Sequence, residues 1–451
     1  MSGAPLGPSL ATQLHHTARC VRAVEQGHSL SDVLPQVAKD LRPGVQALTF
    51  HVLRHLGTAH ALVQQLVERK PDPAVSALLC TALSLMLEDD EAGASSGLHY
   101  AAHTVVNQAV DAARQDRGTA RQAAFINACL RRFLRERPVL LEAALRQPVA
   151  RWNHPTWWIE RLQRDHPEHW QAILNANNQP GPMTLRVNRR RIERSAYQQA
   201  LQAIGVSSTP VGEDGLVLDA PQPVERLPGF ALGHCSVQDA AAQMAATLLL
   251  EGRSWSTAER VLDACAAPGG KTAHLLERAD LHLLALDLDA RRCERVDDTL
   301  KRLGLHGEGR AEVRSADAAQ LATWWDGRLF DAVLLDAPCT ASGIVRRHPD
   351  VRWLRRASDV DQLVKVQRGL LEALWPLLKP GGRLLYATCS VFRAEGADQV
   401  QAFLERHTNA VHRPSPGHLL PGSAAPAGEF NDNPLGGHDG FFYTRIDKAG
   451  P

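Results

Sequence analysis

The chain has 451 residues, which is more than a single hydrophobic core normally accommodates, so two or three domains are expected. Hydrophobic residues make up 44% of the sequence and charged residues 22%, and no apolar run reaches the roughly 18 residues that span a membrane, which argues against an integral membrane protein. The formal net charge is +1, so the composition alone does not indicate a nucleic-acid binder, and any RNA affinity must come from local basic clusters.

The cysteines are expected to be reduced thiols. The first 25 residues lack the apolar block of a secretory signal, so the cytoplasm is the expected compartment. None of the eight cysteines forms a C-x-x-C pair, which argues against a zinc site and against a disulfide framework, and we expect no metal. Most of them should fill the core. They stand at positions 20, 80, 129, 235, 265, 293, 339 and 389.

The region 1–148 has the periodicity of helices. Apolar residues recur three and four positions apart, and Pro43 and the segments 70–73 and 93–97 separate the helices. The pattern predicts an all-α bundle. Its clearest apolar stripes are Val45, Leu48, Val52, Leu53 and Leu56; Val105, Val106, Ala109, Val110 and Ala113; and Phe125, Ile126, Cys129, Leu130, Phe133 and Leu134.

The last predicted helix of this region carries a basic rim, consisting of Arg131, Arg132, Arg135 and Arg137. Such a rim can bind phosphates, although a solvated helix face is the commoner explanation for a run of charges. Two nearby runs, Val-Asn-Gln-Ala-Val at 106–110 and Ala-Phe-Ile-Asn-Ala-Cys-Leu-Arg at 124–131, resemble the NusB-like RNA-binding domain. The resemblance implies that the region 1–148 contacts RNA.

The region 149–235 mixes aromatic, basic and short apolar segments. Trp152, Trp157 and Trp158 open it, and the stretch 185–191 carries four arginines. The mixture is typical of a small α+β RNA-contact subdomain, in which aromatic rings stack on bases and basic groups contact the backbone. A linker subdomain with tryptophans in its core explains the pattern equally well.

Strands and helices alternate in the region 236–451. This alternation predicts an α/β Rossmann-like domain with a doubly wound, mostly parallel sheet, in which ligands bind at the carboxyl ends of the strands. The Pro- and Gly-rich stretch 413–437 is predicted to be a long surface loop before a last strand at 441–443. The other predicted strands are 260–265, 281–287, 311–314, 330–336 and 382–389, with helices at 291–303 and 361–378.

The first of these strands leads into a loop of small residues. Gly269 and Gly270 allow a cofactor to approach the backbone closely. A phosphate-binding P-loop would need glycine where Cys265 stands, so a nucleotide hydrolase is disfavoured. Asp287 ends the next strand, where a carboxylate can bind both ribose hydroxyls, and Asp317 follows the third strand at the adenine position. Together they predict a nucleoside cofactor and leave nicotinamide and S-adenosylmethionine open.

Two thiols and a carboxylate follow the fourth and fifth strands. Asp336-Ala337-Pro338-Cys339 ends one strand, and Thr388-Cys389-Ser390 ends the next. This set suits alkylation of pyrimidine carbon-5, because that carbon becomes nucleophilic only after a thiolate adds to carbon-6. A carboxyl group, here Asp336, can hydrogen-bond N3 in the adduct, and a second thiol, or a water it holds, can remove the carbon-5 proton for release.

These motifs closely resemble those of the NOL1/NOP2/Sun family of RNA 5-methylcytosine methyltransferases. The family's motifs recur at 236–239, 266–272, 336–339 and 388–390, and the segment 343–350 is similar to the family segment that follows the first cysteine. The resemblance, together with the NusB-like region, covers nearly the whole chain. It differs from the family where Glu395 is followed by Gly396 instead of asparagine, which concerns a local turn or cap.

The resemblance implies an S-adenosylmethionine-dependent enzyme that methylates a cytosine of small-subunit (16S) ribosomal RNA, free or partly assembled, as a monomer. It makes Cys389 the nucleophile and Cys339 the residue that helps release the product, with Asp336 beside them. Arg346 and Arg347 can contact RNA phosphates or form surface ion pairs. The implied cofactor contacts are Cys265, Ala266, Ala267, Pro268, Gly269, Gly270, Lys271, Asp287, Asp317 and Asp336.

Two alternatives belong to other classes. A DNA cytosine methyltransferase would use Pro338-Cys339 as its catalytic pair, and the second cysteine argues against it. A non-catalytic RNA-binding or assembly factor would need only the helical region, and the complete set of cofactor and cysteine motifs argues against that.

Overall fold

The computed structural model describes residues 8–87, 100–307, 309–422 and 437–450, and its contacts divide the chain into two units. The first, here called the helical unit, comprises Met1–Pro180 and Val345–Arg356. The second, here called the sheet unit, comprises Gly181–Ile344 and Ala357–Pro451. The predicted segment 93–97 lies outside the described residues.

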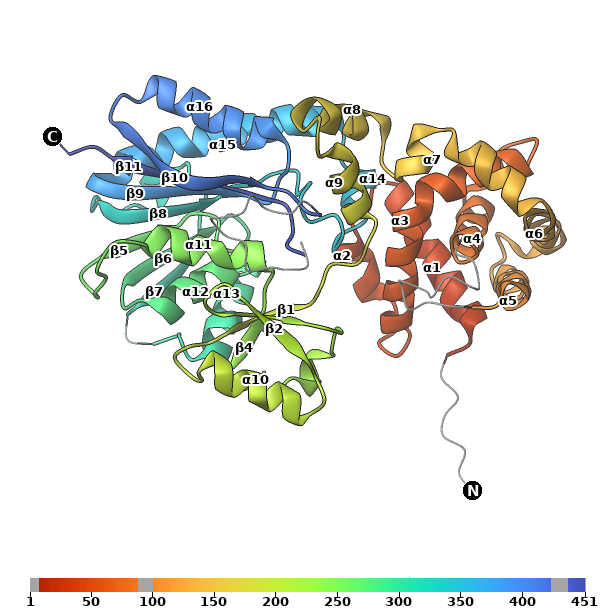
Figure 1. Ribbon diagram of the computed structural model, residues 1–451, viewed down its shortest axis with the longest axis horizontal. Helices are drawn as coiled ribbons and strands as arrows, with labels where there is room; N and C mark the ends of the chain where they lie inside the picture. Colours follow the sequence, from red (N-terminus) through yellow and green to blue (C-terminus); the bar gives the residue numbers. More distant parts are fainter. Residues whose placement is uncertain (1–7, 88–99, 308, 423–436, 451) are drawn as a thin grey trace. The chain divides into compact units, whose positions relative to one another are not determined.

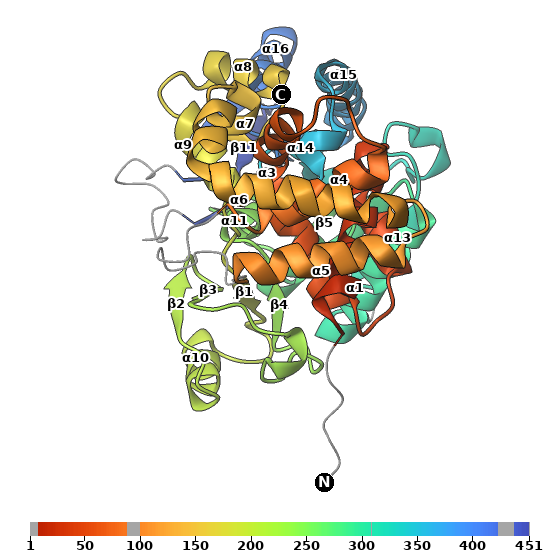
Figure 2. The same ribbon diagram turned by 90° about the vertical axis from the view of Figure 1, so that its right-hand side faces the viewer.

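The described part of the helical unit consists of packed helices, as Figures 1 and 2 show. The helices α5 and α6 lie side by side in Figure 2. The elements are α1 (Leu10–Glu25), α2 (Leu30–Val33), η1 (Leu34–Gln36), α3 (Arg42–Leu66), α4 (Pro73–Ser84), α5 (Ala102–Gln115), η2 (Ala120–Gln122), α6 (Ala123–Leu145), α7 (Pro148–Trp152), α8 (Thr156–Asp165), α9 (Trp170–Asn177) and α14 (Val351–Leu354).

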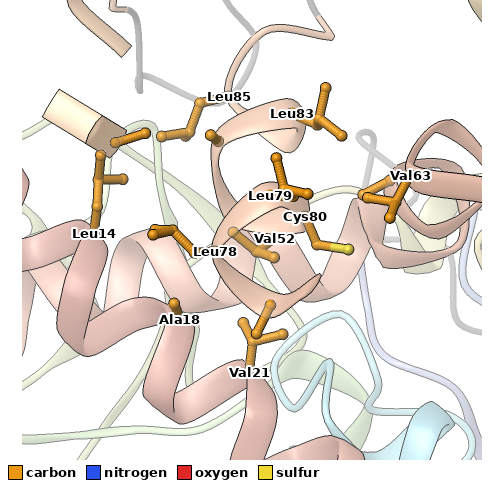
Figure 3. Packing of buried hydrophobic residues seen from close by; sticks show 14 of the residues in the cluster. Leu14, Ala18, Val21, Val52, Val63, Leu78, Leu79, Cys80, Leu83 and Leu85 are labelled. Atoms are coloured by element: carbon orange, nitrogen blue, oxygen red, sulfur yellow. The ribbon is translucent and has the colours of Figure 1, made fainter. Parts of the chain in front are cut away.

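The core of the helical unit is built from the apolar stripes of its helices. Residues of α1, α3 and α4 interdigitate, with Leu14, Val52 and Leu79 among those that are fully buried (Figure 3). The predicted all-α bundle is confirmed. On α6, however, Phe125 and Leu134 are 41% and 37% exposed, contrary to the prediction. The buried residues of this helix face are at positions 126, 129, 130 and 133, which follow the i, i+3, i+4, i+7 pattern. Phe125 and Leu134 lie beside this face, so their side chains are partly exposed.

The segment 345–356 belongs to the helical unit although it is far along the chain. Arg352 is fully buried and donates to the backbone oxygens of Asn153 and Asn177, while Asp350 accepts from the N–H of Leu30 at 3.0 Å. Arg346 is also buried, so the two exposed roles predicted for it, a phosphate contact or a surface ion pair, are wrong. Backbone groups offset the burial of two of these charges, since carbonyl oxygens accept from Arg352 and an N–H donates to Asp350.

The tryptophans at 152–158 pack inside the helical unit. Trp158 is fully buried, and Trp152 lies edge-to-face against Trp170 with ring centroids 5.0 Å apart. Of the two interpretations of these aromatics, the structure favours tryptophans that build a core.

The sheet unit begins with a small antiparallel sheet. Its strands are β1 (Thr184–Val187), β2 (Ser208–Val211), β3 (Gly215–Leu218) and β4 (Cys235–Val237), arranged in the order β2-β3-β1-β4. The helix α10 (Arg194–Ala203) and the turn η3 (Val224–Arg226) connect them. Alternate apolar residues of the strands pack against Tyr197 and Leu201 of α10.

A seven-stranded sheet forms the rest of the sheet unit. Its order is β10-β11-β9-β8-β5-β6-β7, and the five strands from β9 to β7 are parallel. This confirms the predicted doubly wound, mostly parallel α/β fold. The strands are β5 (Arg260–Asp263), β6 (His282–Asp287), β7 (Ala311–Ser315), β8 (Phe330–Asp336), β9 (Leu378–Thr388), β10 (Ala410–Leu419) and β11 (Phe441–Lys448).

Helices cover both faces of this sheet (Figure 1). Along β6, Leu283 and Ala285 pack into one core, while Leu284 and Leu286 pack into the other, as the two-residue period of a strand requires. The first face carries α11 (Ala240–Leu250), α12 (Gly270–Arg278) and α13 (Ala290–Leu303). The second carries α15 (Ala357–Leu374) and α16 (Ala397–Arg406), with the short turns η4 (Leu321–Thr323), η5 (Trp375–Leu377) and η6 (Arg393–Glu395) between elements.

The predicted surface loop at 413–437 is partly wrong. Residues up to Leu419 belong to β10, which pairs antiparallel with β11, and the register shifts between Arg413 and Gly417. The prolines at 414 and 416 fall within that bulge on an edge strand, which is where a sheet tolerates a residue without an N–H. The rest of the predicted loop, 423–436, lies outside the described residues.

Two structural properties bear on function. Within the described ranges, no helix is both long and apolar enough to cross a membrane. Over the same residues, no group of three or more histidine, cysteine, aspartate or glutamate side chains could hold a metal ion.

Candidate active site

The predicted site residues gather at one edge of the seven-stranded sheet. The strands β5, β6 and β8 end at Asp263, Asp287 and Asp336, and β9 ends at Thr388, directly before Cys389. Because these strands are parallel and adjacent in the order β9-β8-β5-β6, their carboxyl ends meet at the same edge. All of these residues belong to the sheet unit.

The two cysteines of the predicted pair lie in contact. Their Sγ atoms are 3.4 Å apart, and both side chains are half-buried. Strand register brings them together, because Asp336 of β8 lies opposite Ala387 of β9, so both cysteines follow within three residues. The N–H of Gly343 also donates to the carbonyl oxygen of Cys389 at 2.9 Å. The pair is therefore fixed by the sheet and by the loop that follows Cys339.

Cys339 lies in an environment that favours its protonated form. Its contact with Cys389 and its burial together raise the pKa of Cys339 well above its ordinary value. The thiol of Cys339 is therefore harder to ionise than that of an exposed cysteine.

Lys271 is placed beside Asp336. Its Nζ donates to a carboxylate oxygen of Asp336 at 2.6 Å and lies 5.1 Å from the centre of the Phe441 ring. Burial lowers the pKa of Lys271, but the attraction of Asp336 outweighs it, so the pKa lies above its ordinary value. The sequence placed Lys271 in the cofactor loop but did not predict this ion pair, which brings a positive charge to the cysteine-bearing end of β8.

The loop 265–271 follows the tight path that its small residues predict. Gly269 has φ +94°, and a Cβ there would lie 3.1 Å from the Cα of Val296 on α13, so a larger residue does not fit without strain. The N–H of Ala266 donates to Leu286 O at 2.8 Å, and the N–H of Ala267 donates to the Asp287 carboxylate at 3.2 Å. The loop is thus tied to the end of β6 before α12 begins at Gly270.

Asp287 and Asp317 of the predicted set accept from backbone N–H groups, whereas Asp263, which ends β5, accepts from the hydroxyl of Thr272 at 2.7 Å. Asp287 is buried and accepts from the N–H groups of Ala267 and Asp289 on different oxygens. Asp317 is half-buried and accepts from the N–H of Ala319 at 2.9 Å. Asp263 is fully buried, and its Oδ1 has no hydrogen-bond partner among the described residues. Burial raises the pKa of Asp263 to about 7.

Arg186 supports the cofactor loop, a role that the sequence did not indicate. It is fully buried on β1 and donates to both carboxylate oxygens of Glu277 at 2.8 Å and to the carbonyl oxygen of Gly270 at 2.7 Å. Arg189 and Arg190 of the same basic stretch pair with Asp214 and Asp280. The expected use of this stretch for RNA is therefore wrong for Arg186, whose guanidinium is enclosed by protein.

Glu395 is the second residue whose position the sequence did not reveal. The sequence relates it only to the turn that follows it, whereas the structure shows it fully buried and bonded to Thr340 and Ser390, the residues directly after the two cysteines. A glutamate in a turn after a strand gives no sequence signal for such a contact, because its partner Thr340 is 55 residues away along the chain.

The basic rim of the helical unit remains a surface feature. Arg131 and Arg135 are exposed on α6, where Arg131 bonds to Asn127 at 3.1 Å. Arg132 forms an ion pair with Glu136 at 3.0 Å, and Arg137 donates to the carbonyl oxygen of Leu87. These contacts are those of a solvated helix face, and the phosphate contact of this rim stays a prediction.

Comparison with solved structures agrees with this fold. The protein named PH0851 has a TM-score of 0.74 at 23% identity, and the match covers 98% of this chain and 99% of that one. A methyltransferase homologue from Pyrococcus horikoshii has a TM-score of 0.52 at 26% identity, covering 65% of this chain and 99% of its own.

Three family models match successive parts of the chain. The NusB family matches residues 13–135, the ferredoxin-like domain of RsmF/B-like methyltransferases matches 154–225, and the 16S rRNA methyltransferase RsmB/F model matches 253–447. The ribosomal RNA small subunit methyltransferase B of Vibrio cholerae is 40% identical over 441 residues, which is 95% of each chain. The chain therefore belongs to the RsmB/F family of 16S rRNA methyltransferases.

Proposed function

We propose that this protein uses S-adenosylmethionine to methylate carbon-5 of a cytosine in 16S ribosomal RNA through a covalent bond to Cys389. The observation that carries the proposal is the 3.4 Å separation of the Cys339 and Cys389 sulfurs, next to the Lys271–Asp336 ion pair. Membership of a 16S rRNA methyltransferase family supports the substrate class. The paired thiols support carbon-5, because that carbon needs a nucleophile at carbon-6 and a base for release.

The family resemblance supports the assignment of roles. It makes Cys389 the thiol that adds to carbon-6, and the raised pKa of Cys339 suits a thiol that holds a proton until release. The addition places electron density on N3, where Asp336 and its partner Lys271 can hold a proton. The bound S-adenosylmethionine supplies the methyl group that carbon-5 receives.

Release needs a base for the carbon-5 proton. Cys339 lies 3.4 Å from the Cys389 sulfur, beside the carbon–sulfur bond that must break. A water held by Cys339, or the Cys339 thiolate once its own proton has passed to water, takes the carbon-5 proton. The double bond between carbon-5 and carbon-6 then re-forms, and the Cys389 thiolate leaves.

The residues of the cofactor loop fit S-adenosylmethionine. Each carboxylate oxygen of Asp287 accepts one backbone N–H, which leaves a lone pair on each for the two ribose hydroxyls. Gly269 and Gly270 would let the loop lie against the nucleoside, and Asp317 would meet the adenine amino group. The proposed contacts are the set named from the sequence, Cys265 to Lys271 with Asp287, Asp317 and Asp336.

We propose a division of labour along the chain, with an RNA-binding region at 1–148, an RNA-contact subdomain at 149–235 and the catalytic domain at 236–451. The family matches to NusB and to the ferredoxin-like domain support it. The target cytosine must be unpaired or flipped out for a thiol to reach carbon-6, so the substrate is free or partly assembled RNA. The enzyme would act in the cytoplasm as a monomer.

The test uses two cysteine variants with unmethylated 16S RNA and S-adenosylmethionine labelled in its methyl group. Cys389→Ala should transfer no label and form no adduct. Cys339→Ala should transfer the methyl group but remain attached to the RNA, visible as a slow band on a denaturing gel. A persistent adduct from Cys389→Ala would overturn the roles, and absence of transfer to any RNA by the wild type would overturn the activity.

A further inference from the structure

We propose that Glu395 is a positioning residue that holds the two cysteine loops at their working separation, an inference that rests on the proposed function. The loop Asp336–Gly343, which carries Cys339, is called the release loop, and the loop Thr388–Phe392, which carries Cys389, is called the nucleophile loop. Glu395 follows the second loop in sequence and is fully buried. Its carboxyl group bonds to both loops.

On the release loop, Glu395 binds the residue next to Cys339. The N–H of Thr340 donates to Oε1 of Glu395 at 2.8 Å, and the Thr340 hydroxyl donates to Oε2 at 2.5 Å. Gln367 of α15 adds a second connection, because its Nε2 donates both to Pro338 O at 2.9 Å and to Oε1 of Glu395 at 3.2 Å. Both flanks of Cys339 are therefore fixed relative to the same carboxyl group.

On the nucleophile loop, Glu395 binds the residue next to Cys389. The Ser390 hydroxyl donates to Oε2 of Glu395 at 2.6 Å. Ser390 also lies 2.8 Å from the hydroxyl of Ser342 on the release loop, which in turn accepts from the N–H of Val391 at 3.0 Å. One oxygen, Oε2, is thus shared by hydroxyls from the two loops.

The backbone of Glu395 anchors this carboxyl group to the sheet. Its carbonyl oxygen accepts from the hydroxyl of Tyr386 on β9 at 2.8 Å. The residue is therefore held from the strand that leads to Cys389, and its side chain reaches the loop of Cys339. A side chain that is fixed at both ends can set the distance between two loops.

The donors around the carboxyl group are uncharged, which separates the role of Glu395 from simple ion pairing. They are the Thr340 N–H, two hydroxyls and the Gln367 amide. Burial raises the pKa of Glu395 above its ordinary value. The position therefore needs a planar group with two polar atoms at the right reach, and an amide of equal length, which can donate to the hydroxyls, should serve in its place.

The experiment measures how readily the two thiols meet, in the absence of RNA and cofactor. The folded full-length chain is treated with diamide, an azo compound that takes one hydrogen from each thiol as the disulfide forms and is itself reduced to the hydrazine. Mass spectrometry of the disulfide-linked peptides gives the rate at which the Cys339–Cys389 disulfide forms. The variants are Glu395→Ala, Glu395→Asp and Glu395→Gln, with Glu405→Ala on the exposed face of α16 as the matched control.

Loss of the carboxyl group in Glu395→Ala, or its retraction by one methylene in Glu395→Asp, should lower the rate of disulfide formation roughly ten-fold or more. Displacing reacting groups by about 1 Å changes reaction rates by this much. The rate of disulfide formation in Glu395→Gln and in Glu405→Ala should stay within about three-fold of the wild-type rate, since neither change removes the hydrogen bonds between residue 395 and the two loops. Thermal unfolding identifies any variant that does not fold, and Glu395→Asp replaces Glu395→Ala if the latter fails. Wild-type disulfide rates in a folded Glu395→Asp protein would overturn the proposal.

Turnover provides the readout that a merely structural role would not move. With 16S RNA, Glu395→Asp should accumulate the covalent adduct and lower kcat while the KM for S-adenosylmethionine is unchanged, because its bonds reach the cysteine loops and not residues 265–271. A rise in the KM for S-adenosylmethionine as large as the fall in kcat, without accumulation of the adduct, would count against Glu395 as a positioning residue. If the wild type methylates no RNA at all, the proposed function fails, whereas the disulfide comparison still decides the role of Glu395.

Discussion

The ammonium nitrogen of Lys271 lies 2.6 Å from a carboxylate oxygen of Asp336, at the end of the strand that leads to Cys339. Lys271 lies in the first turn of α12 and Asp336 ends β8, and the contact places an opposite charge beside the acid predicted to face N3 of the target base. Ion pairs of this kind, largely enclosed by protein, hold both geometry and charge.

Lys271→Met should lower kcat roughly 100-fold, because a group that helps to hold a proton in the transition state contributes about this much. Lys271→Arg keeps the positive charge, so its kcat should fall less than that of Lys271→Met. Labelled methyl transfer to 16S RNA measures both. The matched control is Lys379→Met, which removes a similar pair with Asp331 at 2.8 Å near the opposite end of β8. Equal activity of Lys271→Met and the wild type would remove Lys271 from the mechanism.

Gly269→Ala should weaken cofactor binding and lower stability. The residue has φ +94°, and its new Cβ would press against the backbone of Val296, so we expect a cost of about 1–3 kcal/mol from backbone strain. Isothermal titration with S-adenosylmethionine and thermal unfolding give the two quantities. Gly369→Ala on α15, where a Cβ meets nothing, is the control and should be neutral or slightly stabilising. Wild-type affinity in Gly269→Ala would show that the loop tolerates a side chain.

Arg186→Met should destabilise the sheet unit by about 3–5 kcal/mol, because it leaves the buried carboxylate of Glu277 without its partner. It should also raise the KM for S-adenosylmethionine, since the bond to Gly270 O is lost. Urea unfolding measures the first effect and initial rates the second. Adding Glu277→Leu should recover much of the stability but not the KM. Full recovery of both would mean that Arg186 serves only to neutralise Glu277.

The stability of the helical unit should fall in mild acid because of His154. This side chain is fully buried, and burial, with the nearby Arg352, holds its pKa well below the ordinary value of 6.5. The unfolded chain therefore binds a proton that the folded chain excludes. Stability from this group is complete above about pH 6.5 and is lost as the pH falls below it, by about 2 kcal/mol at pH 5.

Urea unfolding at pH 7 and pH 5 checks this for the wild type and His154→Asn. The variant keeps a donor toward the carbonyl oxygen of Trp152, which the ring nitrogen of His154 contacts at 2.6 Å, but it does not titrate. Between pH 7 and pH 5, the free energy of unfolding of His154→Asn should fall by about 2 kcal/mol less than that of the wild type. His103→Asn, which replaces an exposed histidine of α5, should lose as much stability between these pH values as the wild type. Equal losses in all three proteins would exclude His154 as the source.

Much of the fold could be predicted because it depends on local periodicity. The alternation of apolar residues located β6 and β8 within a residue of their observed bounds, and the stripe at 45–56 is buried as expected. The edge strand β10 was missed because its prolines suit a loop in isolation and are tolerated only at a bulge beside β11. Phe125 and Leu134 were misplaced because a stripe drawn from sequence has no sharp edge.

By itself, the sequence determined the kinds of groups at the site and their order along the chain. Motifs placed Cys339, Cys389 and Asp336 after neighbouring strands, since parallel strands end at one edge. Only the tertiary structure decided the pairing of Lys271 with Asp336, the enclosure of Arg186 and the connection of both cysteine loops by Glu395. Those contacts join segments far apart in sequence, and their partners are chosen by strand order, register and burial, which no single segment encodes.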